Sequence, residues 1–390
     1  MLLKKIMTNI NRKKFLINFQ SLVFFILIII YGLTTKNVMG GSGIFSIDSI
    51  LKYGILFICI SVEGYIFLKN GNEKRETSEN YNNFKFYFII ITFLSLFASF
   101  KQVHFSFRTV QSFIFIFIPM LYSYLILNNW TFRQINFSMK IALFLSVIEY
   151  LFSIRMGFSQ IISSLASINY NNTNASPLES STFALLSLGF VAYFGYYKKN
   201  FLCKIVSLLF VIMTFKRVIT LGGCILVILG ILKIKNLRVN RFFLIVSTIT
   251  LVSFSLIYYY SIQPQNILEI SEKIGFSIRD FSTNRTDRLA WLSMTDFKSY
   301  GLGSTTDFMY KLWGVDLEMD IVQLILEVGA FGVIVFIYFY LRFSKSNLYA
   351  FSFMALLLLN SILSSGMMST FSWIIILIAM STIMEYKEGM

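Results

Sequence analysis

The stretch NRTDRLAWLSMTDFKSYGLGSTTDFMYKLWGVDLEMDIVQLILEVGAFG, residues 284–332, is the longest polar interval in a chain that is otherwise mostly apolar. It combines arginines, carboxylates and aromatic rings, and it continues directly into an apolar segment. Guanidinium groups bind phosphate, and aromatic rings pack against apolar faces of a ligand. Together these side chains suit a phosphorylated sugar, so we expect the functional site in this stretch.

The segments on either side predict an all-α polytopic membrane protein. Of the 390 residues, 56% are hydrophobic and 17% are aromatic, which is too apolar for a soluble protein. Only helices and closed barrels satisfy their backbone polar groups inside lipid, and the long unbroken apolar runs lack the alternation of a barrel. The lipid bilayer is therefore an expected partner.

A span needs about 20 apolar residues, so the sequence predicts about 12 transmembrane helices. Their expected ranges are 15–34, 50–68, 84–100, 110–127, 135–154, 180–197, 201–215, 218–234, 241–260, 319–341, 346–364 and 366–385. We expect helices one to nine in residues 1–260, one large extracytoplasmic loop in 261–318, and the last three helices in 319–390. Residues 155–179 form a second, smaller polar segment on the same side as the large loop.

The formal net charge of +15 raises the question of a nucleic-acid partner. In a membrane protein, however, basic residues first report orientation, because cytoplasmic loops carry an excess of Lys and Arg. The segment before the first expected span and the loops after the even-numbered spans are the basic ones. We therefore expect both termini in the cytoplasm and no nucleic-acid partner.

Lys216 and Arg217 lie in a tight turn on the expected outer side, where the positive-inside bias disfavours them. They are either anchors that extend toward the membrane surface or a fixed cationic site. Arginine offers a planar fork of donors that can grip phosphate with two hydrogen bonds, which lysine cannot do. Arg217 is therefore the first choice for an anion ligand, with Lys216 as a helper.

The large loop adds Arg285 and Arg288, which lie on one face if the segment is helical, with Trp291 a further turn along. These three residues predict a face that binds phosphate and sugar, and Trp313 adds a further ring. A long translocated loop can also escape the positive-inside bias, so its cations are not by themselves proof of a ligand.

Carboxylates follow at helical spacing. If residues 316–327 begin the tenth span, Asp316, Asp320, Gln323 and Glu327 fall at i, i+4, i+7 and i+11 on one face. Acids near the bilayer normally point into a protein cavity or a substrate path, and the alternative is a solvated helix end. Glu63 and Glu149, within other spans, are more simply explained by structural pairing.

The order and spacing of several of these residues resemble the motifs of a known protein family. The arginine after a short outer turn, Asn284-Arg285 before Trp291, the Gly-Leu-Gly-Ser turn at 301–304 and the acidic pair before Glu327-Val-Gly-Ala-Phe-Gly resemble the O-antigen and capsule polymerase (Wzy-type) family and the related O-antigen ligases. The similarity spans roughly residues 205–340. It implies a glycosyltransferase fold of the GT-C kind, an undecaprenyl-diphosphate-linked oligosaccharide as donor, and no metal, nucleotide sugar or other cofactor.

The resemblance also implies roles. The family's first arginine falls on Arg217 and its second on Arg285, with Arg288 as the alternative. Where the family often has His-x-Asp, this chain has Glu318-Met319-Asp320, so a carboxylate would have to act as the base. The expected catalytic residues are Arg217, Arg285, Glu318 and Asp320. The expected substrate-binding residues are Lys216, Arg288, Trp291, Trp313, Asp316, Gln323 and Glu327.

The implied function is polymerisation of lipid-linked repeat units into a capsular, exopolysaccharide or O-antigen chain on the outer face of the bacterial cytoplasmic membrane. A chain-length co-polymerase and a flippase are candidate partners. One alternative is a ligase, which would share the donor and differ in the acceptor. The other is a lipid-oligosaccharide flippase, for which cations within the spans and an internal repeat would be expected. The three cysteines lie in apolar runs and there is one histidine, His104, so no metal site is expected.

Overall fold

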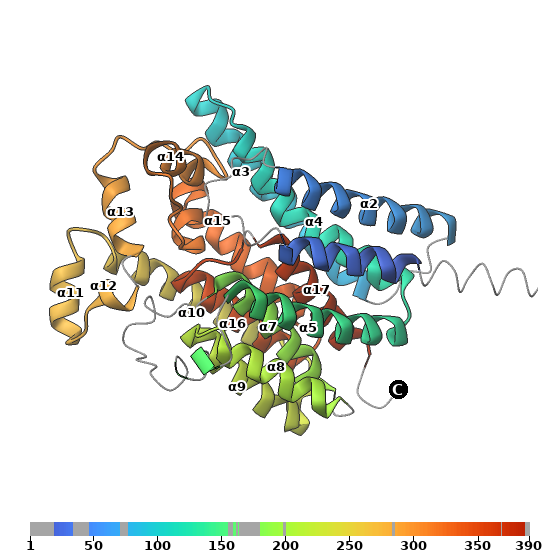
Figure 1. The fold of residues 1–390 in the computed structure, drawn as a ribbon. Helices are drawn as coiled ribbons and strands as arrows, with labels where there is room; N and C mark the ends of the chain where they lie inside the picture. The colour runs from blue at the N-terminus through green and yellow to red at the C-terminus, as the bar shows by residue number, and fades with distance from the viewer. Residues whose placement is uncertain are drawn as a thin grey trace, which may run out of the picture. The chain divides into compact units, whose positions relative to one another are not determined.

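The computed structural model of the protein describes residues 19–33, 47–70, 77–154, 159–160, 163, 180–197, 200–282, 285–367 and 369–386. Within these ranges all regular secondary structure is helical (Figure 1), which confirms the predicted all-α class. Each of the twelve predicted apolar ranges coincides largely with a helix. The N-terminal basic segment and most of the polar segment 155–179 lie outside the described residues.

Six of the described helices are long and apolar enough to cross a membrane, which indicates a multi-pass membrane protein. They are α2 (Ile47–Asn70), α3 (Thr77–Gln102), α4 (Phe107–Asn129), α5 (Phe132–Ile154), α10 (Arg241–Ser261) and α15 (Asp320–Ser344). The apolar helices Phe19–Leu33, α7 (Ser181–Tyr196), α8 (Phe201–Met213), α9 (Arg217–Ile231), α16 (Leu348–Leu363) and α17 (Thr370–Glu385) are shorter. At 1.5 Å per residue, a helix of about 16 residues measures roughly 24 Å, less than the hydrocarbon core of a typical bilayer.

The chain divides into two compact units. The first consists of residues 1–75 and 121–157 and so contains Phe19–Leu33, α2, α5 and the C-terminal part of α4. Its centre is the buried carboxylate of Glu63 on α2. Glu63 accepts hydrogen bonds from Gln20 Nε2 at 3.0 Å, Asn129 Nδ2 at 2.6 Å and Trp130 Nε1 at 2.8 Å.

The partners of the Glu63 carboxylate among the described residues are amide and indole N–H groups, in place of the basic residue that structural pairing would supply. A buried carboxylate without partners is costly, so the three N–H groups lower the cost of burial and fix the helices around α2. Glu149 packs closely on Gly32, where an added Cβ would lie 2.0 Å from the Glu149 Cδ atom.

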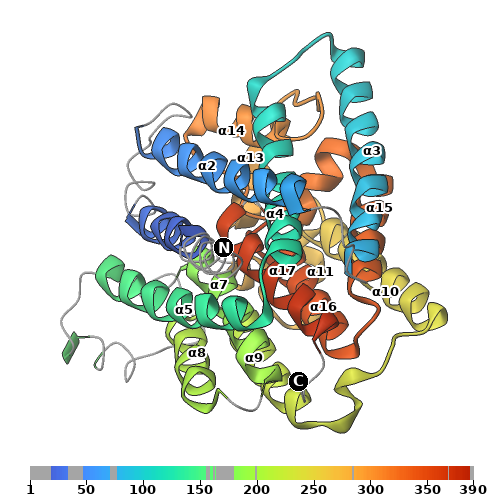
Figure 2. The same cartoon turned by 90° about the vertical axis from the view of Figure 1, so that its right-hand side faces the viewer.

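The second unit consists of residues 76–120 and 158–390. Its core is formed by α15 packed against α3, α10 and α16, and by α7 packed against α8, α9 and α17. Figure 2 shows α15 beside α3 and α10. Most of α17 is buried, from Thr370 to Ile383. Protein surrounds this helix, which explains why it is apolar on all sides.

The predicted outer loop, 261–318, is folded. It forms four short helices: α11 (Ile267–Ile274), α12 (Ile278–Phe281), α13 (Arg285–Ser293) and α14 (Ser304–Trp313). α11, α12 and α13 follow one another in space as well as in sequence (Figure 1). The turn before α14 is held on α3, because Leu302 N–H donates to Ser95 Oγ at 2.9 Å and Ser99 Oγ donates to Tyr300 O at 2.6 Å.

Candidate functional site

The site begins at the turn between α8 and α9. Lys216 is the N-cap residue of α9 and follows Phe215, whose φ of 53° reverses the chain direction. Lys216 is only 8% exposed, and its Nζ atom donates a hydrogen bond to Ser364 Oγ at 3.1 Å. The short turn therefore holds a buried ammonium group against the loop that joins α16 to α17.

Two arginines of α13 lie one helical turn apart and both meet Glu318. Arg288 Nη1 lies 3.0 Å from Glu318 Oε1, and Arg285 Nε lies 3.5 Å from Glu318 Oε2. Arg288 Nη1 also donates to the backbone carbonyl of Asp316 at 2.6 Å. The Arg285 side chain is 10% exposed, whereas that of Glu318 is 41% exposed. The carboxylate thus lies on the open side of the two guanidinium groups.

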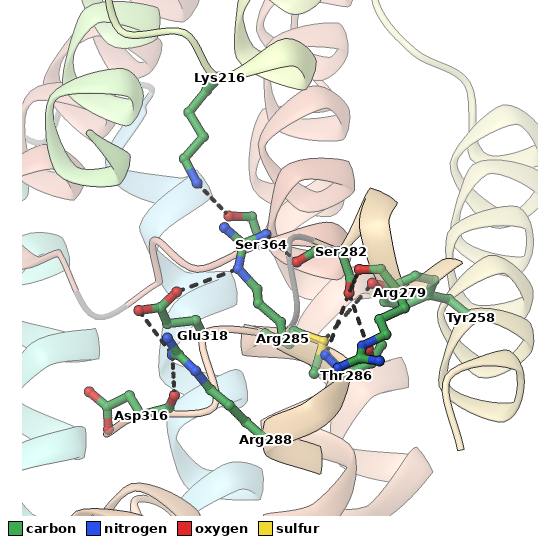
Figure 3. A network of polar contacts seen from close by, with 11 residues as sticks. Lys216, Tyr258, Arg279, Ser282, Arg285, Thr286, Arg288, Asp316, Glu318 and Ser364 are labelled. Carbon is green, nitrogen blue, oxygen red and sulfur yellow. Dashed lines mark hydrogen bonds and ion pairs between the residues drawn. The ribbon is translucent and has the colours of Figure 1, made fainter. Parts of the chain in front are cut away.

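We call Lys216, Arg285, Arg288 and Glu318 the cation cluster. Figure 3 shows the three cations directed from two separate helices toward the region around Glu318 and Ser364. Two arginines pair with one carboxylate, and Lys216 is hydrogen-bonded to Ser364 beside them. The carboxylates of Asp316 and Asp320 also interact electrostatically with Arg288 and Arg285, respectively. Arg285 Nε is buried and makes no hydrogen bond within the described residues, although it lies 3.5 Å from Glu318 Oε2.

The backbone around the cluster is strained. Among the described residues, the non-glycine residues with positive φ are Val103, Phe215 and Glu318. Phe215 precedes Lys216, and Glu318 has a φ of 56°. Strained backbone persists only where the surrounding structure holds it, and such positions concentrate at functional sites. Two of the three positions are therefore at this site.

Asp320, the first residue of α15, holds the loop that faces Lys216. Its Oδ2 atom accepts a hydrogen bond from Met367 N–H at 2.6 Å, and its own N–H donates to Ser364 O at 3.3 Å. Asp320 is 5% exposed. The carboxylate therefore fixes the α16–α17 loop and, through that loop, the hydroxyl of Ser364.

Glu327 is likewise engaged within the protein. Its carboxylate accepts from Gly303 N–H at 2.8 Å, from Thr305 N–H at 3.0 Å and from Gln323 Nε2 at 3.1 Å. The backbone amides belong to the start of α14, where helix geometry favours an anion. The Gly-Leu-Gly turn is thus an anion site, and the chain's own Glu327 occupies it.

The expected polar face is present from Asp320 onward. α15 begins at Asp320, and Asp320, Gln323 and Glu327 are buried on it. Asp316 precedes the helix, so it does not belong to this face. Burial raises the pKa of Asp316, and the neighbouring Arg108 charge opposes the rise.

The two tryptophans come together outside the cluster. The rings of Trp291 and Trp313 have centroids 6.0 Å apart, and Trp291 is 42% exposed. They form an aromatic surface on α13 and α14 that a sugar ring can pack against. Arg217 lies elsewhere, because its guanidinium is 5.6 Å from the centre of the Phe281 ring. Lys216 points into the cation cluster, whereas Arg217 contacts α12.

Ser364 is a site residue that the sequence argument missed. Its only signal is a short polar interruption, Ser-Ser-Gly at 364–366, between two apolar helices. His104 stacks on Tyr300 with ring centroids 4.3 Å apart. No group of three or more His, Cys, Asp or Glu side chains suitable for a metal ion occurs in the described part of the chain.

The cation cluster can bind a phosphate or diphosphate through three N–H donor groups, with one carboxylate beside them. The aromatic surface and the cluster both involve α13, so an anionic group and a sugar can be bound by neighbouring turns of one helix. Comparison of the chain with protein-family models, with curated proteins and with solved structures finds no match.

Proposed function

We propose that the chain is a membrane glycosyltransferase that joins undecaprenyl-diphosphate-linked repeat units into a polysaccharide. The observation that carries the proposal is the pairing of Arg285 and Arg288 with Glu318, with Lys216 held nearby on Ser364 (Figure 3) and with Lys216 and Arg285 buried. Buried cations are costly unless an anion balances them. A diphosphate leaving group supplies that balance, and the resemblance to the Wzy-type polymerases supplies the class of donor.

In this proposal the bond between C1 of the donor sugar and the diphosphate oxygen breaks. The electron pair goes to the diphosphate, whose developing charge is stabilised by the three cations. The acceptor hydroxyl oxygen forms the new bond to C1, and its proton passes to a carboxylate. The exposed ring of Trp291 and the half-buried ring of Trp313 beside it offer the packing surface for a sugar of the donor or acceptor.

Glu318 is a better candidate than Asp320 for the proton acceptor. Glu318 is open on one side, whereas Asp320 is 5% exposed and holds Met367. An incoming diphosphate competes for the two guanidinium groups that pair with Glu318 and thereby frees the carboxylate at the moment when the acceptor needs a base.

The proposal includes twelve spans, a GT-C-like arrangement and a location in the bacterial cytoplasmic membrane with the site on the outer face. The twelve apolar helices are compatible with this topology, although the six shorter ones require a thinner bilayer or a re-entrant position. A ligase would use the same cluster with another acceptor. A flippase is less well supported, because the three cations lie at helix ends and in the folded loop and not along the interior of the long apolar helices.

The test is complementation of a strain that lacks the gene. Wild type, Lys216→Ala, Arg285→Ala and Glu318→Gln are compared for glycan length and for the lipid-linked single units in each leaflet. Loss of an oxyanion or leaving-group contact typically costs about 100-fold or more in rate, so we expect single units to accumulate in the outer leaflet. Arg279→Ala is the matched control, because this exposed arginine pairs with Asp287 outside the cluster.

Three results would overturn the proposal. Single units trapped in the inner leaflet would mean that the chain moves the lipid-linked unit and does not polymerise it. Long glycan in all three cluster variants, at normal protein levels, would remove the cluster from the chemistry. Long chains that remain on the lipid and are never joined to a final acceptor would point to a ligase.

A further inference from the structure

A second group of cations lies at the other end of α15, a 25-residue helix that is kinked at Gly329. It consists of Arg238, Arg241, Arg342 and Lys345, which we call the basic end cluster. Arg241 is the first residue of α10, and Lys345 is the C-cap of α15. The group is distinct from the cation cluster and has no part in the proposed transfer.

Tertiary structure brings these residues together from two segments about 100 residues apart in sequence. Val239 N–H donates to Lys345 O at 3.0 Å, and Leu348 N–H donates to Leu237 O at 2.7 Å. These two backbone hydrogen bonds tie the segment before α10 to the segment after α15. Arg238, which lies between the two bonded residues of the first segment, is thereby held beside Lys345.

The four cations of the basic end cluster carry the same sign of charge and act on one another. None of them forms a salt bridge with a carboxylate of the described residues. Burial lowers the pKa of Lys345, and the charges of Arg342, Arg238 and Arg241 lower it further. Like charges held together repel one another, so an anion from outside the chain would stabilise this arrangement.

The position of the basic end cluster in the fold indicates which class of anion can reach it. α10 and α15 pack against each other, and both are long apolar helices that end at this cluster. Exposed apolar residues begin at once on α10, where Phe242 is 75% exposed and Ile245 is 52% exposed. A helix with such a surface faces lipid, so its end lies at the level of the phospholipid headgroups.

We propose that the basic end cluster is a binding site for the phosphate of an anionic phospholipid headgroup. The positive-inside bias explains why basic residues occur at this end. This bias does not explain why four basic residues from two distant segments are held together with no carboxylate in a salt bridge to them among the described residues. Arginine forks suit phosphate oxygens, and basic pockets between spans are suited to anionic headgroups.

The test uses the full-length protein purified in a neutral detergent and titrated with phosphatidylglycerol, with bound lipid counted by native mass spectrometry. Phosphatidylcholine serves as the zwitterionic comparison, and inorganic phosphate is added as a competitor at constant ionic strength. The variant is Arg238→Gln with Arg241→Gln, two exposed residues whose change leaves the core intact. The control is Lys101→Gln with Lys298→Gln, which removes two exposed cations elsewhere in the same unit.

We expect wild type and the control to prefer phosphatidylglycerol, and the variant to bind it about 30-fold more weakly, because each surface cation contributes roughly a fivefold factor. Equal binding by wild type and variant would overturn the site. An equal loss in the control would show that only overall charge matters, which also overturns it. Displacement of the lipid by millimolar inorganic phosphate would show that free phosphate is the ligand, and would overturn the lipid as its source.

Discussion

At the scale of single residues, Glu318 is held in place against its own backbone preference. Its φ of 56° belongs to the left-handed region that favours glycine, yet the side chain has to lie between Arg285 and Arg288. The chain therefore accepts local strain to place a carboxylate where it meets two cations. The cost of strain and the benefit of the charge can be measured separately.

We expect Glu318→Gly to be more stable than Glu318→Ala by about 1 kcal/mol, because both lose the carboxylate and only alanine keeps the left-handed strain. Both variants should lose polymer formation. Thermal unfolding of the two purified variants in the same detergent measures the difference. If the alanine variant is equally or more stable, the backbone at Glu318 is not strained.

Lys216 and Arg217 are adjacent but have different surroundings. Lys216 is buried on Ser364, whereas Arg217 lies over Phe281. We expect Lys216→Met to reduce polymer formation by about 100-fold, as for loss of a charged contact to the leaving group. Arg217→Lys keeps a cation over the ring and should reduce it far less.

The same complementation assay with quantified membrane protein measures both variants. A severe loss in Arg217→Lys with a mild loss in Lys216→Met would restore Arg217 as the phosphate ligand, which the resemblance to the polymerase family favours. Ser364→Ala should fall between them, because it removes only the hydroxyl that accepts from Lys216.

At the scale of elements, the turn before α14 is fixed by contact with α3 and by Glu327. Gly301 has a φ of 106°, and an added Cβ would lie 2.4 Å from Ser95 Oγ and 2.6 Å from Ser95 O. Gly303, two residues further on, donates its N–H to the Glu327 carboxylate. The turn therefore connects α3, α14 and α15 at a point where only glycine fits.

Gly301→Ala should destabilise the protein by several kcal/mol, since the new methyl group meets backbone as well as a side chain. Gly314→Ala is the matched control, because Gly314 also has a positive φ, 69°, but nothing lies within 4 Å of an added Cβ. The control should lose only about 1 kcal/mol from strain. Thermal unfolding of both variants measures the difference, and equal losses would mean that the contact with α3 is not close.

The acid Asp307 of α14 gives the folded loop a pH dependence. Burial favours its neutral form, but hydrogen bonds from Tyr300, Lys311 and Ser106 outweigh this and lower the pKa of Asp307. A carboxyl whose pKa is lower in the folded state stabilises it above the unfolded pKa near 4, and this stabilisation is lost as pH falls through the folded pKa.

Asp307→Asn should therefore lower stability at pH 7 by about 1 to 3 kcal/mol, the usual cost of losing hydrogen bonds to a charged group. The difference from wild type should shrink below about pH 4, where the carboxyl of the unfolded chain becomes protonated, and should be lost as pH falls through the lowered pKa of the folded state. Unfolding measured across this pH range would show it. A difference that stays constant with pH would mean that charge is not involved.

At the scale of the whole molecule, the two cationic groups of the second unit lie at opposite ends of α15. The proposed topology places the cation cluster outside and the basic end cluster inside. We expect a cysteine at Asp296 to react with a membrane-impermeant maleimide in intact cells, and a cysteine at Arg238 to react only after permeabilisation. Both positions are exposed, so labelling of both from outside would contradict the topology.

The helices and the membrane class could be predicted from the sequence alone, and the region of the site stays a prediction. Apolar content over a window of about 20 residues reflects the cost of leaving backbone groups unsatisfied in lipid, and this is a local property of the chain. The twelve apolar ranges and the grouping of Arg285, Arg288 and Trp291 on one helix follow from it. Helical spacing alone also predicts Asp316 on the same helix as Asp320, whereas the helix begins only at Asp320.

Only the tertiary structure decided the partners of each charge. Lys216 donates to Ser364, which lies 148 residues away in the sequence. The Glu327 carboxylate accepts a hydrogen bond from the backbone N–H of Gly303, just before α14. Nothing in the sequence near Lys216 indicates that it, and not Arg217, points into the cluster. The direction of a side chain and the desolvation of its charge depend on what packs against it, and that is settled only when distant helices meet.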